Sequence, residues 1–546
     1  SEASFVEYSS KVSSCQLEFS IDWRKVKHIE KTGNAPILQA SYDIETYSVD
    51  GSFPSPTVKE NVITQIATTF KRLNSDDFHL KHIICLKKCA PINEPNTVLE
   101  CYATEEEVLI AWKNLIKRTD PDILYQYNGD QFDCYYLYTR AMINHCKDFL
   151  FLGRLKDTAS VLTENSFSSS AYGSSNFKRL SMPGRINFDI LIYIKREYKE
   201  NSYKLDYIAD KYIGQNKNPV TPVMMFKIFE EGDPEEIKKV AMYCIQDTVL
   251  PQKLVDKMHI LQNQISMSNV THVPIRYLVE RGQQIKVFSQ ILKETRKENF
   301  LVPTINNYTK GAKDSDDEES FTGATVLPPL KGAYFEPVTV CDFASLYPSI
   351  IRAHNLCFST IVLDETYDNI QGLDYETIEW EDTVPDKQPV KHSFKFCQKQ
   401  QGILPKLLAK LTVERKNFKK LMAQEQDPFI KEVYNKGQLA VKVSMNSIYG
   451  FLAAPMLCCK PIAASVTAIG RLMIENTKNY MEKHYDASVA VYGDTDSVFI
   501  KFKTATSEAY SNALKFKQTD KQKTKELREQ CIQEAIDLGK VAATKA

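Results

Sequence analysis

The sequence lacks the features of membrane, secreted and zinc-bound proteins. It has no apolar run of the roughly 20 residues that a membrane-spanning helix needs, no signal-peptide pattern and no Cys-x-x-Cys pair. Its 13 cysteines are odd in number and scattered. They indicate reduced thiols of an intracellular protein, because a disulfide framework or a zinc cluster requires cysteines at paired spacings.

The sequence also lacks net charge and internal repeats. Lysine plus arginine and aspartate plus glutamate both number 69, so the formal net charge is zero. This excludes a protein that is basic overall, but a local basic channel can still bind phosphate groups. The 546 residues allow several domains and a large buried core.

The most informative segment that is present covers residues 489–500. β-branched and aromatic residues flank Gly493 and Asp494, which predicts two strands joined by a turn at that pair. Asp494 and Asp496 are two residues apart, so in an extended segment both face one side. A divalent cation such as Mg²⁺ would neutralise two carboxylates held so close; the alternative is an exposed polar hairpin tip.

A second acid ends a second apolar segment. Residues 337–343 predict a strand that carries Asp342, and residues 344–351 predict a tight turn into a helix with Pro348 in its first turn. A carboxylate in an apolar strand is costly to bury unless it is paired or bound to metal. Asp342 beside Asp496 would form a cage for two cations, of the kind that supports phosphoryl transfer.

Two long helical patterns lie between these acids, over residues 401–423 and 428–448. Arg415 and Lys419 share a face of the first helix because they are four residues apart. The second helix carries side chains at a similar spacing, namely Gln438, Lys442, Asn446 and Tyr449. Together they predict a site for a triphosphate with a base stacked nearby. We interpret Lys416 and Lys420 as an ordinary solvated face, but expect Lys442 to be poorly solvated among its apolar neighbours.

The first half carries another set of acids. Asp43 and Glu45 lie two residues apart in a predicted strand, Asp133 follows a run of aromatic residues, and Tyr243 and Asp247 are four apart on a predicted helix. Each piece alone is weak, because pairs of acids at this spacing are common by chance. Four carboxylates with a nearby phenol suit hydrolysis of a phosphodiester with two metal ions.

Three segments in the second half resemble the polymerase motifs of family B DNA polymerases. They are residues 342–349, 442–450 and 492–497, and they occur in the order of that family. Residues 281–287, 323–327 and 353–357 also match its pattern, and the acids of the first half resemble its proofreading 3′→5′ exonuclease motifs. The resemblance covers nearly the whole chain and is strongest to replicative polymerases of the eukaryotic delta type and of large DNA viruses.

The resemblance implies a mixed α/β multidomain fold. We expect the end of an N-terminal domain over residues 1–37, an RNase H-like exonuclease domain over 38–258 and a connection over 259–337. A palm with an antiparallel sheet follows over 338–400, then helical fingers over 401–450, and the palm resumes over 451–546. Residues 166–175 are expected to form a hairpin tip or loop, and the acidic run 313–320 a solvated loop.

The resemblance also implies roles for the polymerase residues. Asp342, Asp496 and the carbonyl of Phe343 would bind two Mg²⁺ or Mn²⁺ ions, with Asp494 as a supporting acid. The deoxynucleoside triphosphate would be bound by a larger set, namely Ser345, Leu346, Tyr347, Arg415, Lys419, Lys442, Asn446 and Tyr449. Tyr347 would also exclude a 2′-hydroxyl group, although simple core packing is the alternative for this ring.

For the exonuclease, the resemblance implies that Asp43, Glu45, Asp133 and Asp247 bind metal and that Tyr243 orients the attacking water. The sequence departs from the family in one motif. The family usually has glycine before its Tyr-Asn pair and an apolar residue after it, but here those positions hold Gln126 and Gly129. We interpret Asp130 as a turn residue rather than a ligand, and Phe132 as an aromatic ring available for stacking on single-stranded DNA.

The partners that the resemblance implies are primer–template DNA, deoxynucleoside triphosphates and a sliding clamp, in the nucleus or at a viral replication site. The Lys-Lys-x-Tyr segment and the thumb domain of the family do not follow residue 546 in this sequence, so we expect a fragment. Two alternatives remain open, namely a nuclease with an inactive polymerase half and an inactive polymerase-shaped scaffold. The presence of every candidate ligand favours an active polymerase with proofreading.

Overall fold

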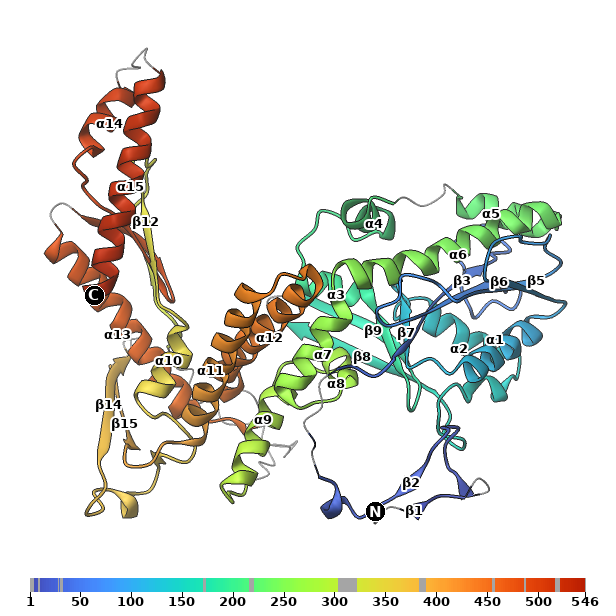
Figure 1. Cartoon of the computed structure of the whole chain (residues 1–546), viewed down its shortest axis with the longest axis horizontal. Helices are drawn as coiled ribbons and strands as arrows, with labels where there is room; N and C mark the ends of the chain where they lie inside the picture. Colours follow the sequence, from blue (N-terminus) through green and yellow to red (C-terminus); the bar gives the residue numbers. More distant parts are fainter. Residues whose placement is uncertain are drawn as a thin grey trace. The chain divides into compact units, whose positions relative to one another are not determined.

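The computed structural model divides the chain into two compact units, Ser1–Leu261 and Gln262–Ala546 (Figure 1). The residues that the structure describes are 4–7, 10–27, 29, 33–169, 173–215, 220–302, 322–382, 389–453, 457–485, 488–515 and 521–545. The acidic run at residues 313–320 lies outside them. The division follows Leu261, whereas the predicted exonuclease domain ends at residue 258.

The first unit is built on a mixed sheet with strand order β10-β7-β3-β4-β5-β6. The strands are β10 (Ile186–Asp189), β7 (Ile123–Gln126), β3 (Leu38–Thr46), β4 (Ile63–Arg72), β5 (Leu80–Leu86) and β6 (Thr97–Tyr102). Strand β3 pairs parallel with β7 and antiparallel with β4. It lies inside the sheet, which explains its long run of buried residues.

Helices cover both faces of this sheet, and a separate apolar cluster fills each side. One cluster joins Tyr42 of β3 to Trp112 of α1 (Glu105–Thr119) and includes residues of α2 (Asp133–Ile143). The other joins Ala67 of β4 to Cys244 of α6 (Pro234–Lys257). Helix α6 begins after Asp233, whose carboxylate accepts a hydrogen bond from the Glu235 N–H group and caps the helix.

Several smaller elements complete the first unit. Strands β8 (Val161–Ser169) and β9 (Gly173–Ser181) form an antiparallel hairpin. The hairpin tip or loop expected over residues 166–175 includes residues 170–172, which lie outside the described residues. The remaining elements are β1 (Ser4–Phe5), β2 (Phe19–Ser20), η2 (Trp23–Lys25), η3 (Lys147–Leu150), α3 (Ile190–Glu197), α4 (Leu205–Ile213) and α5 (Pro222–Glu231).

The second unit contains an antiparallel sheet with order β11-β16-β17-β12. Its strands are β11 (Val326–Leu327), β16 (Val489–Asp494), β17 (Ser497–Lys501) and β12 (Thr339–Asp342). A second, three-stranded sheet has order β13-β15-β14, from β13 (Ile361–Val362), β14 (Tyr375–Asp382) and β15 (Val390–Cys397).

Long helices complete the second unit. Helices α11 (Ile403–Gln424) and α12 (Pro428–Leu452) are the two helices predicted from the sequence, and they pack against each other. A Cβ on Gly437 would lie 2.7 Å from the Phe418 ring, so the two helices approach closely there. The other helices of this unit are α8 (Ile275–Glu280), α9 (Gln284–Lys297), α10 (Leu346–Ala353), η4 (Glu365–Tyr367), α13 (Lys460–His484), α14 (Ser507–Lys515) and α15 (Lys521–Lys545). Helix α7 (Ile260–Thr271) spans the division between the two units.

The mixed α/β fold with an antiparallel sheet and a helical pair agrees with the fold predicted from the sequence. Among the described residues, no helix is both long enough and apolar enough to cross a lipid bilayer.

Candidate active sites

The first candidate site is the end of the antiparallel sheet where β12 and β17 meet. The register places Asp342 opposite Ser497, and Ser497 is also opposite Asp494 on β16. The N–H group of Phe343 donates a hydrogen bond to the Asp496 carbonyl at 2.8 Å. Asp342 and Asp496 therefore lie at the same end of the sheet, although 154 positions of sequence numbering separate them.

The electrostatics of this site depend on the two acids together. Partial burial raises the pKa of Asp496, and the negative charge of Asp342 raises it further, with a smaller contribution from Asp494. A carboxylate whose charge is disfavoured by a neighbouring carboxylate gains most from a bound cation. The donor set is all oxygen, which fits a hard divalent ion.

The turn in the acidic hairpin is not where the sequence predicted it. Strand β16 runs through Asp494, and the two-residue turn is Thr495–Asp496, with Thr495 in the left-handed region at φ 52°. Gly493 is needed for another reason, because a Cβ there would lie 2.7 Å from a methyl group of Leu327. The argument that Asp494 and Asp496 face one side of an extended strand is therefore wrong, since Asp496 lies in the turn.

Asp494 is held by its own neighbours. Its carboxylate accepts hydrogen bonds from the Thr495 hydroxyl at 2.9 Å and from the Tyr492 hydroxyl at 3.4 Å. Its charge still contributes to the raised pKa of Asp496. This geometry suits the supporting position that the sequence assigned to Asp494.

Helix α10 brings Tyr347 to the same site. The helix begins after Ser345, which adopts left-handed backbone angles at φ 55°, and Pro348 lies in its first turn as expected. The ring of Tyr347 packs against the ring of Tyr449 with centroids 4.3 Å apart. Burial raises the pKa of Tyr347 to about 12, with further contributions from Tyr449 and Asp496. Tyr347 is thus half-buried between another aromatic ring and the acids.

A basic hollow of about 220 Å³ lies between α10 and the helical pair. The residues that line it are Ala344, Ser345, Pro348, Ser349, Arg352, Thr412, Arg415, Lys416, Lys419 and Met445. The structure thus brings Ser345, Arg415 and Lys419 together. Arg415 also donates from Nε to the Gln438 side-chain oxygen at 3.3 Å, which links the two helices.

The structure corrects one expectation about the cations and adds to another. Lys442 is exposed, because the helical turn places it beside Leu439 and Val443 on the outer face of α12, while Val441 points into the core. Lys416 is exposed, in agreement with the solvated face interpreted from the sequence, and it also lines the hollow. Arg352 lines the hollow without having been predicted. Leu346 is buried in the core, and Asn446 is exposed on α12.

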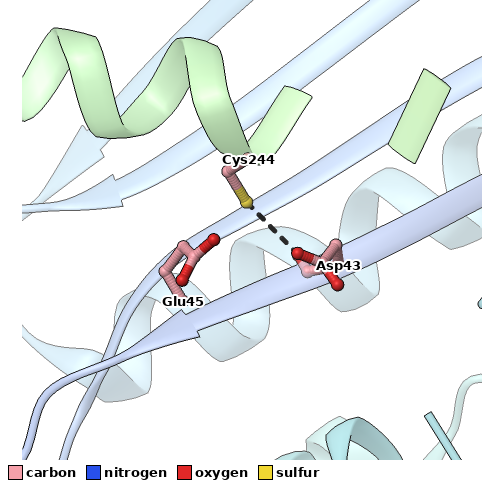
Figure 2. Close-up of side chains that lie close together, drawn as sticks. All are labelled: Asp43, Glu45 and Cys244. Atoms are coloured by element: carbon pink, nitrogen blue, oxygen red, sulfur yellow. Dashed lines mark hydrogen bonds between the residues drawn. The ribbon is translucent and has the colours of Figure 1, made fainter. Parts of the chain in front are cut away.

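The second candidate site lies on β3 and α6 in the first unit. Ligand atoms of Asp43, Glu45 and Cys244 all lie within 4.8 Å of one another. Figure 2 shows the three side chains. The Cys244 thiol donates a hydrogen bond to the Asp43 carbonyl at 3.7 Å. Cys244 was not predicted as a site residue; its position three residues before Asp247, nearly one helical turn, was the available signal.

The remaining predicted acids belong to the same electrostatic cluster. Asp133 is buried at the start of α2 and accepts a hydrogen bond from the Ile44 N–H group at 3.3 Å. Burial raises the pKa of Asp133 to about 7, and the charges of Asp130 and Asp247 add to the shift. Asp247 also acts on Cys244, whose pKa is raised mainly by burial. Tyr243 is half-buried on α6, one turn before Asp247.

The loop before Asp133 is held by buried acids that the sequence did not identify. Asp189 accepts hydrogen bonds from the N–H groups of Asn128 at 3.0 Å and Asp130 at 3.1 Å. Asp130 does lie in a turn, as expected, but its side chain is fully buried and accepts two hydrogen bonds from the guanidinium of Arg179 on β9. Phe132, half-buried, packs against Phe53 with ring centroids 5.4 Å apart.

Comparison with known proteins gives two matches to families. Residues 273–533 match DNA polymerase family B, and residues 2–208 match the exonuclease domain of DNA polymerase family B. Among solved structures, the chain is similar to the family B DNA polymerase from the hyperthermophilic archaeon Pyrobaculum calidifontis, with a TM-score of 0.59 and 23% sequence identity over 89% of this chain and 56% of that chain.

Similar proteins include catalytic subunits of DNA polymerase delta. The protein from Glycine max is 36% identical over 92% of this chain and 46% of its own length, and the protein from Plasmodium falciparum is 38% identical over the same shares. The chain spans about half the length of these curated relatives. They are eukaryotic delta proteins, so the viral part of the predicted resemblance gains no support from them. The chain matches both the polymerase region and the exonuclease domain of one family, so it belongs to DNA polymerase family B.

Proposed function

We propose that this chain carries the catalytic centres of a replicative DNA polymerase with a 3′→5′ proofreading exonuclease. It would extend a primer on a DNA template with deoxynucleoside triphosphates and remove mispaired nucleotides. The observation that carries the proposal is the convergence of Asp342 and Asp496, joined through the Phe343 to Asp496 hydrogen bond. Membership of the family supports the same assignment.

The polymerase residues fit a pair of divalent cations. The raised pKa of Asp496 has Asp342 as its main charged cause, so cations between these carboxylates would relieve their repulsion. Asp342, Asp496 and the Phe343 carbonyl would hold two Mg²⁺ or Mn²⁺ ions, and Asp494 would support them. When bound, such ions lower the pKa of the primer 3′-hydroxyl and neutralise charge on the triphosphate.

The basic hollow supports the location of the triphosphate. Arg415 and Lys419 line it together with Ser345, so phosphate oxygens there would meet a guanidinium, an ammonium and the start of α10. Lys442 and Asn446 would approach the nucleotide from the exposed face of α12. The paired rings of Tyr347 and Tyr449 would border its sugar and base.

The acids of the first unit support the exonuclease. Asp43, Glu45, Asp133 and Asp247 would hold its divalent ions, and Tyr243 would orient the attacking water. A buried Asp133 with a pKa near 7 would release its proton when a cation binds, because the cation stabilises the charged form. Single-stranded primer ends would reach this site, with Phe132 available for stacking.

Primer extension by the full-length protein that contains this chain tests the proposal. We expect extension by the wild type and its loss in Asp496→Asn, while Asp43→Ala abolishes digestion of a single-stranded 3′ end and keeps extension. Digestion without extension by the wild type would instead identify a nuclease with an inactive polymerase half. If neither activity is present, the chain is a scaffold and the proposal is wrong.

Partners and location follow from the proposed activity. Primer–template DNA and deoxynucleoside triphosphates are the substrates, a sliding clamp is the expected accessory protein, and the nucleus or a viral replication site is the expected place of action. A pull-down of the full-length protein with the clamp of its own organism tests that partner.

A further inference from the structure

Three cysteines gather at one end of the six-stranded sheet, away from the predicted metal ligands in sequence. Cys85 on β5 is the register partner of Cys101 on β6, and the two strands are parallel. Cys89 lies three residues after the end of β5. β6 is the last strand in the described order of the sheet, and Cys101 is exposed on it, whereas Cys85 is fully buried.

The two register partners project from the same face of the sheet. Ile83 and Leu99 are the register pair two residues earlier; Ile83 belongs to the apolar cluster under α6 that contains Cys85, and Leu99 packs against that cluster. Because side chains alternate along a strand, Cys101 shares the face of Leu99. Neighbouring strands lie about 4.8 Å apart, which is within the roughly 4.4–6.8 Å that separates the Cα atoms of disulfide-bonded cysteines.

The environments of the two thiols differ in a way that suits a reaction between them. A hydrogen bond from the Cys85 thiol is the largest cause that lowers the pKa of Cys101 to about 6. The same contact raises the pKa of Cys85, and its contact with Cys89 and its burial raise that pKa further. Near neutral pH, Cys101 is therefore an accessible thiolate, and thiolates are the nucleophilic form of cysteine.

Cys89 also contacts Cys85, which lowers the pKa of the Cys89 thiol, but Cys89 is less accessible to a reagent from solvent. Its side chain is buried, and its thiol donates a hydrogen bond to the Ala90 carbonyl at 3.4 Å. A metal site is also less well supported, since the described residues that bring three ligand atoms within 4.8 Å of one another are Asp43, Glu45 and Cys244. The geometry therefore favours a bond between Cys85 and Cys101.

We propose that Cys101 is a site of oxidation by hydroperoxides and that Cys85 resolves the product to a reversible disulfide. The Cys101 thiolate attacks the O–O bond of hydrogen peroxide, forms a sulfenic acid and releases hydroxide, which takes up a proton to give water. The Cys85 sulfur then displaces the hydroxyl group of the sulfenic acid, and its proton leaves with that group as a second water. Two thiols lose two electrons, and one peroxide gains them.

The test is mass mapping of the disulfide in the whole chain. The protein is treated with hydrogen peroxide, its remaining thiols are blocked with iodoacetamide, and it is digested with trypsin and a glutamyl endopeptidase. Cleavage after Lys88 and Glu100 separates Cys85, Cys89 and Cys101 onto different peptides. We expect a Cys85–Cys101 cross-link with a mass loss of about 2 Da that dithiothreitol reverses. A Cys85–Cys89 link, or Cys101 still fully alkylated, would overturn the proposal.

Variants separate the two roles. In Cys85→Ala we expect no cross-link and an accumulation of sulfenic acid on Cys101, trapped by dimedone. In Cys101→Ala, where the replaced side chain is exposed, we expect at least a roughly tenfold slower oxidation of Cys85, because the reactive thiolate is gone. Cys15→Ser, at a half-buried cysteine outside the strands, is the control and keeps the cross-link. Oxidation of Cys85 at an unchanged rate in Cys101→Ala contradicts the assignment even if Cys85→Ala fails to fold.

Discussion

The side chain of Gln126 occupies the space into which a side chain at Gly129 would project. A Cβ on Gly129 would lie 2.2 Å from the Gln126 carboxamide oxygen and 2.8 Å from its Cβ. Gln126 is fixed there, since its amide group donates to Asp130 at 2.7 Å and its oxygen accepts from Tyr42 at 2.5 Å. The two departures from the family pattern therefore form one matched exchange. The larger side chain stands at position 126, and position 129 holds the glycine that leaves room for it.

Gly129→Ala is expected to destabilise the protein by about 1–3 kcal/mol, the usual cost of overpacking a buried site. Rotation of the Gln126 side chain cannot relieve the contact, because its own Cβ is one of the atoms too close. In the double variant Gln126→Gly and Gly129→Ala this contact disappears. A double-mutant cycle of unfolding free energies measures the coupling, which we expect to exceed about 1 kcal/mol in favour of the double variant.

Gly282→Ala is the matched control, because a Cβ at Gly282 meets nothing within 4 Å. We expect its unfolding free energy to change by less than about 0.5 kcal/mol. Additive effects of the two changes at positions 126 and 129 would show that the exchange is not matched.

Asp189 is predicted to make the stability of the first unit depend on pH. Burial raises the pKa of Asp189 to about 7, with the charge of Asp130 as the next cause. The folded protein then keeps a proton that the unfolded chain releases above about pH 4. The contribution of this group to stability is complete below pH 4 and is lost as pH rises through 7. In Asp189→Asn we expect the midpoint of thermal unfolding to fall less between pH 5 and 8 than in the wild type.

The control for this prediction is Asp50→Asn, at an exposed acid whose pKa is lowered to about 2 by hydrogen bonds from Ser52 and Ser48. Asp50 is ionised in both states across that range, so its replacement leaves the slope unchanged. Equal slopes for Asp189→Asn and the wild type would mean that another group carries the pH dependence.

The acids of both candidate sites could be proposed from the sequence because each lies in a short segment with a recognisable local pattern. Asp43 and Glu45 lie two residues apart in β3, and Asp342 ends the short strand β12. The turn at Thr495–Asp496 could not be placed, because Thr495 adopts a left-handed conformation without the glycine or asparagine that usually signals it. The turn was instead predicted at Gly493, but the glycine there is required because a side chain would collide with Leu327.

Contacts between distant segments were beyond sequence reasoning for a different reason. Asp189 is 61 residues from Asn128, and Arg179 is 49 residues from Asp130, so no local pattern connects them. The exposure of Lys442 was mispredicted because its immediate neighbours in sequence are apolar. In a helix the neighbours in space are three or four residues away, and two of these, Leu439 and Asn446, are exposed.

Tyr347 is predicted to select deoxyribonucleotides through its packed ring. The ring is confined between Tyr449 at 4.3 Å and Gly470, where an added Cβ would lie 3.2 Å from it. We expect Tyr347→Ala to raise the ratio of ribonucleotide to deoxyribonucleotide incorporation by roughly tenfold to a hundredfold, because an open space would accept a 2′-hydroxyl. Steady-state insertion of single nucleotides measures the ratio.

Tyr347→Phe separates this role from packing, since it keeps the ring and removes only the hydroxyl. We expect its ratio to remain near that of the wild type. An unchanged ratio in Tyr347→Ala, together with a lower midpoint of thermal unfolding, would assign the ring to packing alone.

The basic hollow predicts which cations act on the triphosphate. Arg415→Ala and Lys419→Ala each remove a cation that lines the hollow with Ser345, so we expect kcat/KM for the incoming nucleotide to fall by roughly tenfold to a hundredfold, the cost of losing a charge-assisted hydrogen bond. Lys420→Ala is the control, because Lys420 is exposed on the same helix and is not among the residues that line the hollow.

Arg415→Ala is expected to lower kcat/KM more than Lys419→Ala does, since it also breaks the hydrogen bond to Gln438 that links α11 to α12. Gln438→Ala isolates that link, and a loss of kcat/KM as large as that of Arg415→Ala would show that Arg415 positions the helices instead of binding phosphate.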